Sequence, residues 1–204
     1  MAGGRPHPRD RPVTVLLPAA ERVAVAWKNG GGVTREIAAA PPGADMAAFA
    51  WRVSLAEVAA DGPFSAFPEV ERTLTLVEGA GMDLTVGGRR RLVDTRYVPQ
   101  DFPGDVPTDC RLLGGPVVNL NVMWRRGGAA PTVAVVRGRL RLPAAPALVV
   151  ALDGGADLAG VRLGRYDALL LTGEDTVLHA HGPTAVVGLT PARGLAALTH
   201  DERH

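Results

Sequence analysis

Short runs of valine and leucine, interrupted by glycine and proline, constrain the fold of this 204-residue chain more than any other feature. Long stretches with helical periodicity are scarce. Runs of this length, with turn residues between them, are typical of an all-β sandwich or barrel. The expected strands cover residues 13–17, 22–27, 51–55, 72–77, 82–86, 117–123, 132–142, 148–152, 168–171 and 185–189. The sequence therefore predicts an all-β protein.

A weak internal repeat predicts how these strands are grouped. Residues 102–120 and residues 171–187 both follow the order strand, glycine-acid turn, strand, Gly-Pro turn, strand. Repetition at about half the chain length indicates two similar barrels, and two tandem jelly-roll barrels are the simplest such architecture. We therefore expect a flexible leader at residues 1–12, a first barrel with the ligand pocket at residues 13–127, and a second barrel with the tail at residues 128–204.

Charge and composition exclude several classes of protein. Lysine and arginine number 22 and aspartate and glutamate 21, so the net charge of +1 does not favour a nucleic-acid or membrane-surface partner. A single cysteine, Cys110, allows no intrachain disulfide and no cysteine-based metal site. No run of 18 apolar residues occurs, and the first dozen residues lack the apolar core of a secretory signal. These features favour a cytoplasmic protein.

Rare polar residues gather in two short segments. Lys28 is the only lysine, and Asn29, Asn119 and Asn121 are the only asparagines. Lysine is a compact ammonium donor that the planar arginine fork does not replace, and asparagine offers a donor and an acceptor together. We expect both segments, together with Trp27, to bind a ligand. For Asn29 alone the alternative is an ordinary Asn-Gly turn.

Strand alternation suggests which barrel holds the ligand. It places Asn119 and Asn121 on one face of their strand. Burying unpaired amides is costly, so a barrel interior lined with amides is suited to a hydrogen-bonding ligand. The equivalent stretch of the second copy, residues 185–189, has no polar side chain, which indicates a structural barrel. The alternative is that the two asparagines face solvent.

Further candidate residues lie on neighbouring predicted strands. Arg35 follows three glycines that let the backbone approach a ligand closely. Alternation puts Arg52 and Ser54 on one side of their strand and Trp51 on the other. A buried Arg52 would clamp a carboxylate, and an exposed one would be a surface charge. Arg125, the first of an arginine pair, either seats an anion at the barrel mouth or marks the domain join.

Evidence for catalysis or a metal is weak. Glu36 and Glu57 are the weak candidates for an acid or a base, with surface ion pairing as the alternative. His179 and His181 have strand spacing, but no carboxylate follows them as a jelly-roll metal site requires. The sequence therefore predicts no metal and no cofactor.

Several segments together resemble the HutD/Ves family, in that family's order. They are residues 27–37, 51–68, 72–74, 78–82, 102–113 and 115–127. The resemblance spans about residues 13 to 127 and continues more weakly to about residue 190. It implies a bicupin, that is, two packed cupin barrels without the cupin metal triad. It also implies a link to histidine utilisation, in which family members serve as accessory or regulatory ligand-binding proteins.

Three positions depart from the family pattern. Asn119 stands where aspartate is usual, Glu69 where glycine is usual, and Glu71 where aspartate is frequent. The first departure makes the pocket less acidic.

We therefore expect a cytoplasmic accessory or regulatory protein of histidine utilisation that binds a small carboxylate of the urocanate or formyl- or formimino-glutamate class. The residues assigned to the ligand are Trp27, Lys28, Asn29, Arg35, Trp51, Arg52, Ser54, Asn119, Asn121 and Arg125. Lys28 and Arg52 would meet the carboxylate, the asparagines would bind amide or imidazole groups, and a tryptophan would cover the planar part. Replacing Lys28 with methionine is predicted to abolish binding.

Two other functions stay open. One is a metal-free cupin enzyme, an isomerase or hydrolase, with Glu36 or Glu57 as base. The other is a partner protein of a histidine-degrading enzyme that binds no ligand. A homodimer formed through exposed barrel edges is also expected.

Overall fold

The computed structural model describes residues 14–128, 130–173 and 175–189, and nearly all of its regular structure is β-strand. These residues form seventeen strands and one 3-10 turn, η1 (Ala19–Glu21), and no α-helix occurs among them. The all-β prediction is confirmed. No helix in the described part of the chain could span a membrane. The expected leader, residues 1–12, and the end of the tail, from residue 190 on, lie outside the described residues.

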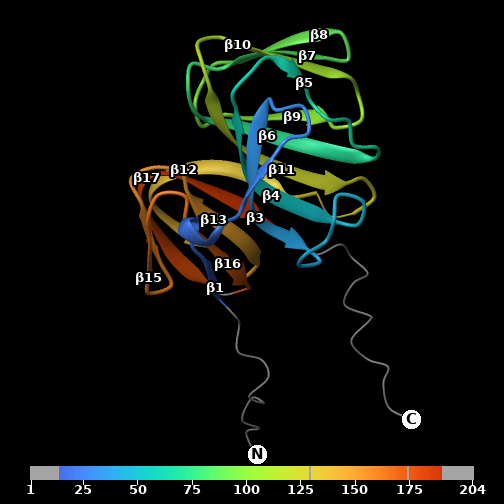
Figure 1. The fold of residues 1–204 in the computed structure, drawn as a ribbon. Coiled ribbons are helices and arrows are strands. Elements are labelled where there is room, and N and C mark those ends of the chain that lie inside the picture. Colours follow the sequence, from blue (N-terminus) through green and yellow to red (C-terminus); the bar gives the residue numbers. More distant parts are fainter. Residues whose placement is uncertain (1–13, 129, 174, 190–204) are drawn as a thin grey trace, which may run out of the picture.

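Two antiparallel sheets form the upper body in Figure 1. The six-stranded sheet consists, in spatial order, of β2 (Ala24–Ala26), β3 (Gly32–Ala40), β4 (Trp51–Val58), β11 (Val117–Arg125), β6 (Val70–Glu78) and β9 (Pro99–Pro103). The four-stranded sheet consists of β5 (Gly62–Pro63), β10 (Thr108–Leu112), β7 (Met82–Val86) and β8 (Arg89–Val93). Buried side chains from both sheets, such as Leu74 and Leu84, pack into one core.

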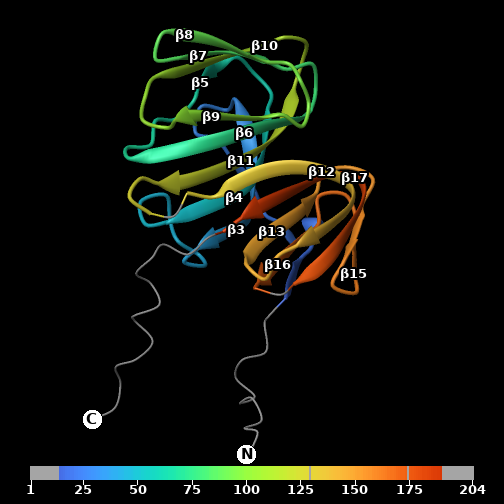
Figure 2. The same cartoon turned by 180° about the vertical axis from the view of Figure 1, so that it is seen from behind.

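A seven-stranded antiparallel sheet forms the second body, which is drawn mainly in orange and brown below the first (Figure 2). Its path is β1 (Val15–Leu17), β16 (Ala168–Thr172), β13 (Pro146–Ala151), β17 (Thr176–Gly188), β14 (Ala156–Leu158) and β15 (Val161–Leu163), and β12 (Thr132–Leu142) also pairs with β17. The sheet curls around its own apolar core, which includes Val149, Leu169 and Leu178. The two bodies are the two tandem cupin-type barrels.

The first strand departs from the expected grouping, which assigned residues from 13 onward to the first barrel. Val15 pairs with Leu170 and Leu17 with Ala168, so β1 is the edge strand of the second barrel. The physical reason is that β16 offers an open edge, and a short apolar strand satisfies its hydrogen-bonding groups.

The outer face of the six-stranded sheet packs against the second barrel. One core cluster joins Val53 of β4 and Leu120 and Val122 of β11 to Leu148 of β13 and Val187 of β17. Because side chains alternate along a strand, the residues between these apolar ones must face the interior of the first barrel. The barrel interface therefore determines which side chains of β4 and β11 can line a cavity.

Two tyrosines make reciprocal contacts between the barrels. Tyr97, before β9, and Tyr166, before β16, share the dipeptide Arg-Tyr and a left-handed φ of 67°. The guanidinium of Arg137, on β12, lies 5.6 Å from the Tyr97 ring, while the Tyr166 hydroxyl donates a hydrogen bond to Glu78 of β6. This pair is a second sign of the internal repeat.

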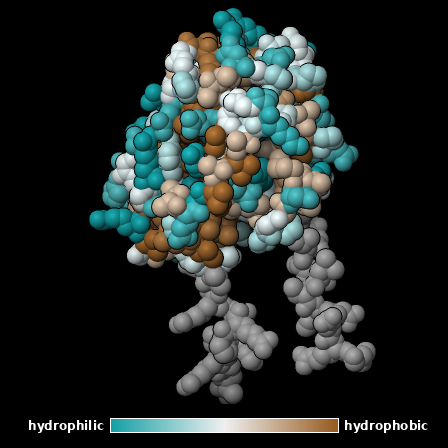
Figure 3. All heavy atoms as spheres, viewed as in Figure 1, coloured by the Kyte–Doolittle hydropathy of each residue, from teal (hydrophilic) through white to brown (hydrophobic). Residues whose placement is uncertain are grey.

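Exposed apolar side chains occur on several edge strands, β1 and β2 among them. On the face seen in Figure 3, polar and apolar residues are interspersed, with apolar ones gathering toward the lower edge. Val15 and Leu16 on β1, and Val23 and Val25 at β2, are exposed. Edges of this kind are where the expected homodimer would form, and the dimer stays a prediction.

Glu69 occupies a backbone conformation that favours glycine. Its φ is 60° and its side chain is exposed. We expect Glu69→Gly to raise the free energy of unfolding by about 0.5–1 kcal/mol, because the left-handed region is strained for residues with a Cβ. Urea denaturation of Glu69→Gly beside Glu69→Ala, which keeps the Cβ, measures this. A glycine variant no more stable than the alanine variant would contradict the prediction.

Candidate functional site

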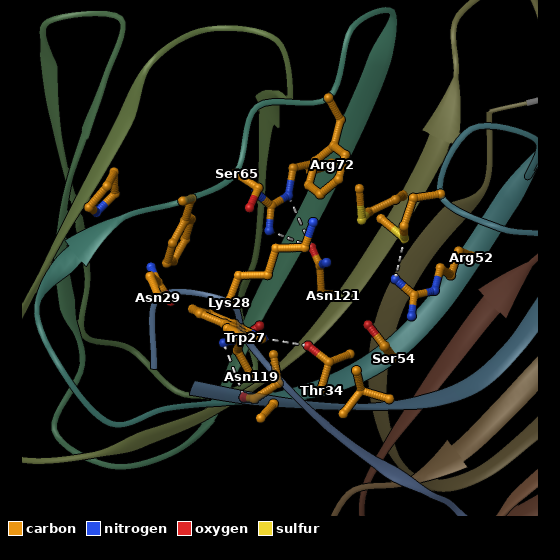
Figure 4. A pocket seen from close by; sticks show the side chains of 18 residues that line it. Trp27, Lys28, Asn29, Thr34, Arg52, Ser54, Ser65, Arg72, Asn119 and Asn121 are labelled. Carbon is orange, nitrogen blue, oxygen red and sulfur yellow. Dashed lines mark hydrogen bonds between the residues drawn. The ribbon is translucent and has the colours of Figure 1, made fainter. Parts of the chain in front are cut away.

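A cavity of about 570 Å³ lies inside the first barrel (Figure 4). The inner face of β3, β4, β6 and β11 forms its wall, and the segments that follow β2 and β5 close it. Seven of the ten residues expected to bind a ligand line it: Trp27, Lys28, Asn29, Arg52, Ser54, Asn119 and Asn121. Residues far apart in the sequence are therefore brought together at one site.

Strand alternation places the amides in the barrel interior. Asn119 and Asn121 are almost fully buried, as is Ser54 on the adjacent strand β4. The Asn119 side-chain amide donates to the backbone oxygen of Ala56, 3.3 Å away. The alternative in which the asparagines face solvent is therefore wrong.

Arg72 of β6 is the main site residue that the sequence analysis missed. Its side chain is buried, and its Nε and Nη2 atoms donate to Asn121 Oδ1 at 3.3 and 3.4 Å. Three phenylalanine rings surround the guanidinium carbon, with centroids at 5.2, 5.8 and 5.2 Å: Phe64, Phe67 and Phe102. This cage holds the guanidinium in a fixed position at the cavity.

The charge of Arg72 is not neutralised by the protein. In the part of the chain that the structure describes, no carboxylate lies within 4 Å of its guanidinium. Burial lowers the pKa of Arg72 to about 10, so the group still carries its charge at neutral pH. A buried cation without an anion is costly unless a partner arrives, because water no longer solvates it. The cavity is therefore suited to an anion.

The segment after β2 forms one rim of the cavity. Trp27 Nε1 donates to Thr34 Oγ1 at 2.8 Å, and its ring packs edge-on against Phe64. Asn29 Oδ1 accepts from the Gly31 backbone N–H at 3.1 Å, so its oxygen serves the turn, as the alternative for this residue proposed. Lys28 is exposed, and Figure 4 shows its side chain pointing toward Arg72 and Asn121.

Arg52 lines the cavity but already has a partner. Its Nε lies 2.6 Å from Glu36 Oε2, and its Nη1 lies 2.9 Å from the sulfur of Met46. Glu36, one of the two candidate bases, is therefore bound by Arg52 and does not itself line the cavity. Arg52 is less available to a ligand than Arg72.

The other predicted residues lie elsewhere. Arg35 and Glu57 are on the opposite face of the six-stranded sheet. Trp51 packs against the core between the barrels. Arg125 donates to the backbone oxygen of Phe49 at 3.1 Å and covers its ring, so it holds the segment before β4. The structure does not bring these four side chains to the cavity.

One histidine of the pair, His181, contacts a carboxylate. His181 Nε2 lies 2.8 Å from Asp157 Oδ2, and the pKa of Asp157 is lowered by this contact and by Arg162. Residues 14–189, apart from positions 129 and 174, contain no group of three His, Cys, Asp or Glu side chains placed to hold a metal.

Two packed barrels of antiparallel strands, with a polar cavity inside one of them, define a bicupin-type protein. The model of the HutD family matches residues 19–187. The chain belongs to the HutD family.

Relatives and solved structures agree with this membership. An uncharacterized 21.2 kDa protein in the hutC 3' region of Pseudomonas putida is 32% identical over 170 residues, covering 80% of this chain and 89% of the relative. Protein Ves of Cronobacter sakazakii is 40% identical over 101 residues, 49% of this chain and 54% of Ves. HutD from Pseudomonas fluorescens SBW25 superposes with a TM-score of 0.80 at 31% identity, over 88% of this chain and 99% of that one.

A more distant structure shares only the fold. A cupin 2 conserved barrel domain protein from Leptotrichia buccalis is 11% identical with a TM-score of 0.53, over 81% of this chain and 92% of that one.

Proposed function

We propose that this protein is an accessory or regulatory protein of histidine utilisation that binds a small carboxylate metabolite in the first-barrel cavity. The single observation that carries the ligand class is Arg72, a buried cation that faces the cavity without a carboxylate partner among the described residues. HutD membership and the name of the Pseudomonas putida relative, which places it beside hutC, support the pathway.

The cavity offers a complementary partner for each part of such a metabolite. Arg72 Nε and Nη2 already donate to Asn121, and its Nη1, which makes no hydrogen bond to a described residue, is the donor offered to a carboxylate. Trp27 and Phe64 supply flat apolar surface for a planar group, and Asn119 supplies an amide. Lys28, exposed at the rim, offers a second positive charge. Urocanate would use the first charge and the aromatic surface, and a formyl- or formimino-glutamate would use both charges.

A ligand titration tests the proposal. Purified protein is titrated with urocanate, N-formylglutamate and formiminoglutamate while thermal unfolding is followed. A ligand that binds only the folded state stabilises it by about 2.7 kcal/mol at a hundredfold excess over the dissociation constant. We expect a saturable rise with at least one of them. A flat response to all three would contradict the proposal and favour the partner-protein alternative.

Lys28 distinguishes the two ligand types. Because Lys28 is exposed, its ion pair with a ligand contributes about 1 kcal/mol to binding. Its replacement should therefore weaken binding in part, whereas the sequence alone predicted a complete loss. We expect Lys28→Met to weaken N-formylglutamate binding about fivefold to tenfold and urocanate binding little. Isothermal titration measures both, with Lys28→Arg as the control that keeps the charge. An equal loss for both ligands would show that Lys28 does not read a second carboxylate.

A further inference from the structure

A second cavity of about 510 Å³ lies on the other face of the six-stranded sheet, at the junction of the two barrels. It is bounded by the segment between β1 and β2, by β3, β4 and β11, and by the turn before β16. The residues that matter for its chemistry are Arg22, Arg35, Leu55, Glu57, Glu78 and Tyr166. None of them lines the first cavity.

Strand alternation separates the two cavities. On β3, Thr34 faces the first cavity and Arg35 the second, and on β4 Ala56 faces the first and Glu57 the second. A single layer of sheet, the six-stranded one, therefore separates two polar cavities, one on each of its faces. A ligand in one cavity does not reach the side chains of the other.

Three charged side chains in the second cavity, Arg22, Arg35 and Glu57, make few hydrogen bonds to other protein groups. Arg35 Nη1 lies 3.8 Å from Glu57 Oε2, too far for a hydrogen bond, and neither side chain makes a hydrogen bond to any other described residue. Compact ion pairs elsewhere in the protein are much closer, such as Arg90 to Asp83 at 2.8 Å. The Arg35 and Glu57 side chains, 43% and 46% exposed, therefore form a loose ion pair without a hydrogen bond between them.

Arg22 is a second cation of this cavity, and one of its hydrogen-bond donors has no partner among the described residues. Its Nη2 donates to the Leu17 backbone oxygen at 2.9 Å, but its Nε is buried and has no hydrogen-bond partner among the described residues. Burial lowers the pKa of Arg22, and nearby Asp167 partly opposes this shift. Glu78, in contrast, is already bound by Arg165 at 2.7 Å and by the Tyr166 hydroxyl. The groups available to a ligand are therefore two guanidiniums and one carboxylate.

We propose that this second cavity binds a free amino acid in its zwitterionic form. The ligand carboxylate lies between Arg22 and Arg35, its ammonium group meets Glu57, and its side chain lies against Leu55 and Val118. The opposite charges of the ligand's carboxylate and ammonium groups match a guanidinium and a carboxylate that stand 3.8 Å apart without a hydrogen bond to each other. The proposal is independent of the carboxylate site in the first cavity.

The test measures binding of each proteinogenic L-amino acid by thermal shift and isothermal titration. Acetate and propylammonium, which each carry one of the two charges, are tested beside them. We expect at least one amino acid to bind saturably and both half-ligands to bind at least about tenfold more weakly. No stabilisation by any amino acid would overturn the proposal. Acetate binding as tightly as the best amino acid would overturn it as well, since the site would then be a simple anion site.

Variants locate the bound amino acid. Glu57→Gln and Arg35→Gln are expected to weaken its binding about tenfold each, since each removes one charge-assisted contact. Arg141→Gln is the matched control, because it breaks an exposed pair with Asp175 on the second barrel. Arg72→Met in the first cavity should leave amino-acid binding unchanged. Binding that survives Glu57→Gln and Arg35→Gln, or that is lost in Arg72→Met, would overturn the assignment to the second cavity.

Discussion

Replacing Arg72 with methionine is expected to weaken carboxylate binding about a hundredfold or more and to leave the protein at least as stable as the wild type. The loss follows because Arg72 is the buried cation of the first cavity, and removing one partner of a buried charge pair costs about 3–5 kcal/mol. Isothermal titration with urocanate and N-formylglutamate measures it.

The free energy of unfolding is expected not to fall in Arg72→Met, although binding is lost, and the reason is the cost of burying the charge. Burial lowers the pKa of Arg72 from its ordinary value of 12.5 to about 10, so below that pH the folded state carries a penalty of about 3 kcal/mol. This penalty is relieved only as the pH rises through about 10. Methionine removes it, although the contacts with Asn121 and the three phenylalanine rings are lost. We expect an unfolding free energy no lower than that of the wild type.

A conservative substitution of Arg72 provides the control for this prediction. Arg72→Lys retains the charge without the planar fork, and we expect it to bind the carboxylate more weakly than wild type but more tightly than Arg72→Met. Unchanged binding in Arg72→Met would remove Arg72 from the site. A folded Arg72→Met with large losses of both binding and stability would indicate a structural role instead.

Gly32→Ala is expected to lower the free energy of unfolding by about 3 kcal/mol or more and to remove ligand binding with it. Gly32 begins β3, and a Cβ there would press into the backbone oxygen of Glu57 and lie 3.1 Å from the Trp27 ring. The backbone of β4 cannot yield without disturbing the sheet, so the strain falls on the Trp27 segment at the cavity rim. Urea denaturation and urocanate titration measure the two effects.

The neighbouring glycine provides the control. A Cβ at Gly31 would meet only the side chain of Asn29, at 3.4 Å, which is ordinary contact. We expect Gly31→Ala to change the unfolding free energy by less than about 1 kcal/mol. Similar losses in both variants would show that the whole segment is intolerant of side chains, and the specific clash at Gly32 would not be the cause.

The sequence predicted the fold well because its signals are local. Alternating apolar residues and Gly-Pro turns indicate strands wherever they occur, and their repetition predicted two barrels. The place of β1 could not be predicted in this way, because its partner strand β16 lies about 150 residues away and nothing in residues 15–17 specifies it. Pairing over such distances depends on which sheet edge stays open once the rest of the barrel has formed.

The site was predicted only in part, because the candidate residues were chosen for how rare their residue types are in this chain. The only lysine and all three asparagines do line the first cavity. Arginine is common in this chain, so rarity could not single out Arg72. Strand alternation could have identified Arg72, since it shares its face of β6 with the buried Leu74 and Leu76. A charged residue on such a buried face needs an explanation. The pairing of Arg52 with Glu36 depends on strand register, which local patterns do not specify.

The pairing of β1 with β16 has a consequence for how the protein is made. On the ribosome, residues 15–17 are synthesised before every other described strand, yet the partner strand at residues 168–172 is among the last to appear. The strands of the first barrel, residues 24–125, are all translated in between and can fold as a unit while synthesis continues. The nascent chain must therefore keep its apolar first strand unpaired until the second barrel is almost complete, and only then does that strand close the edge.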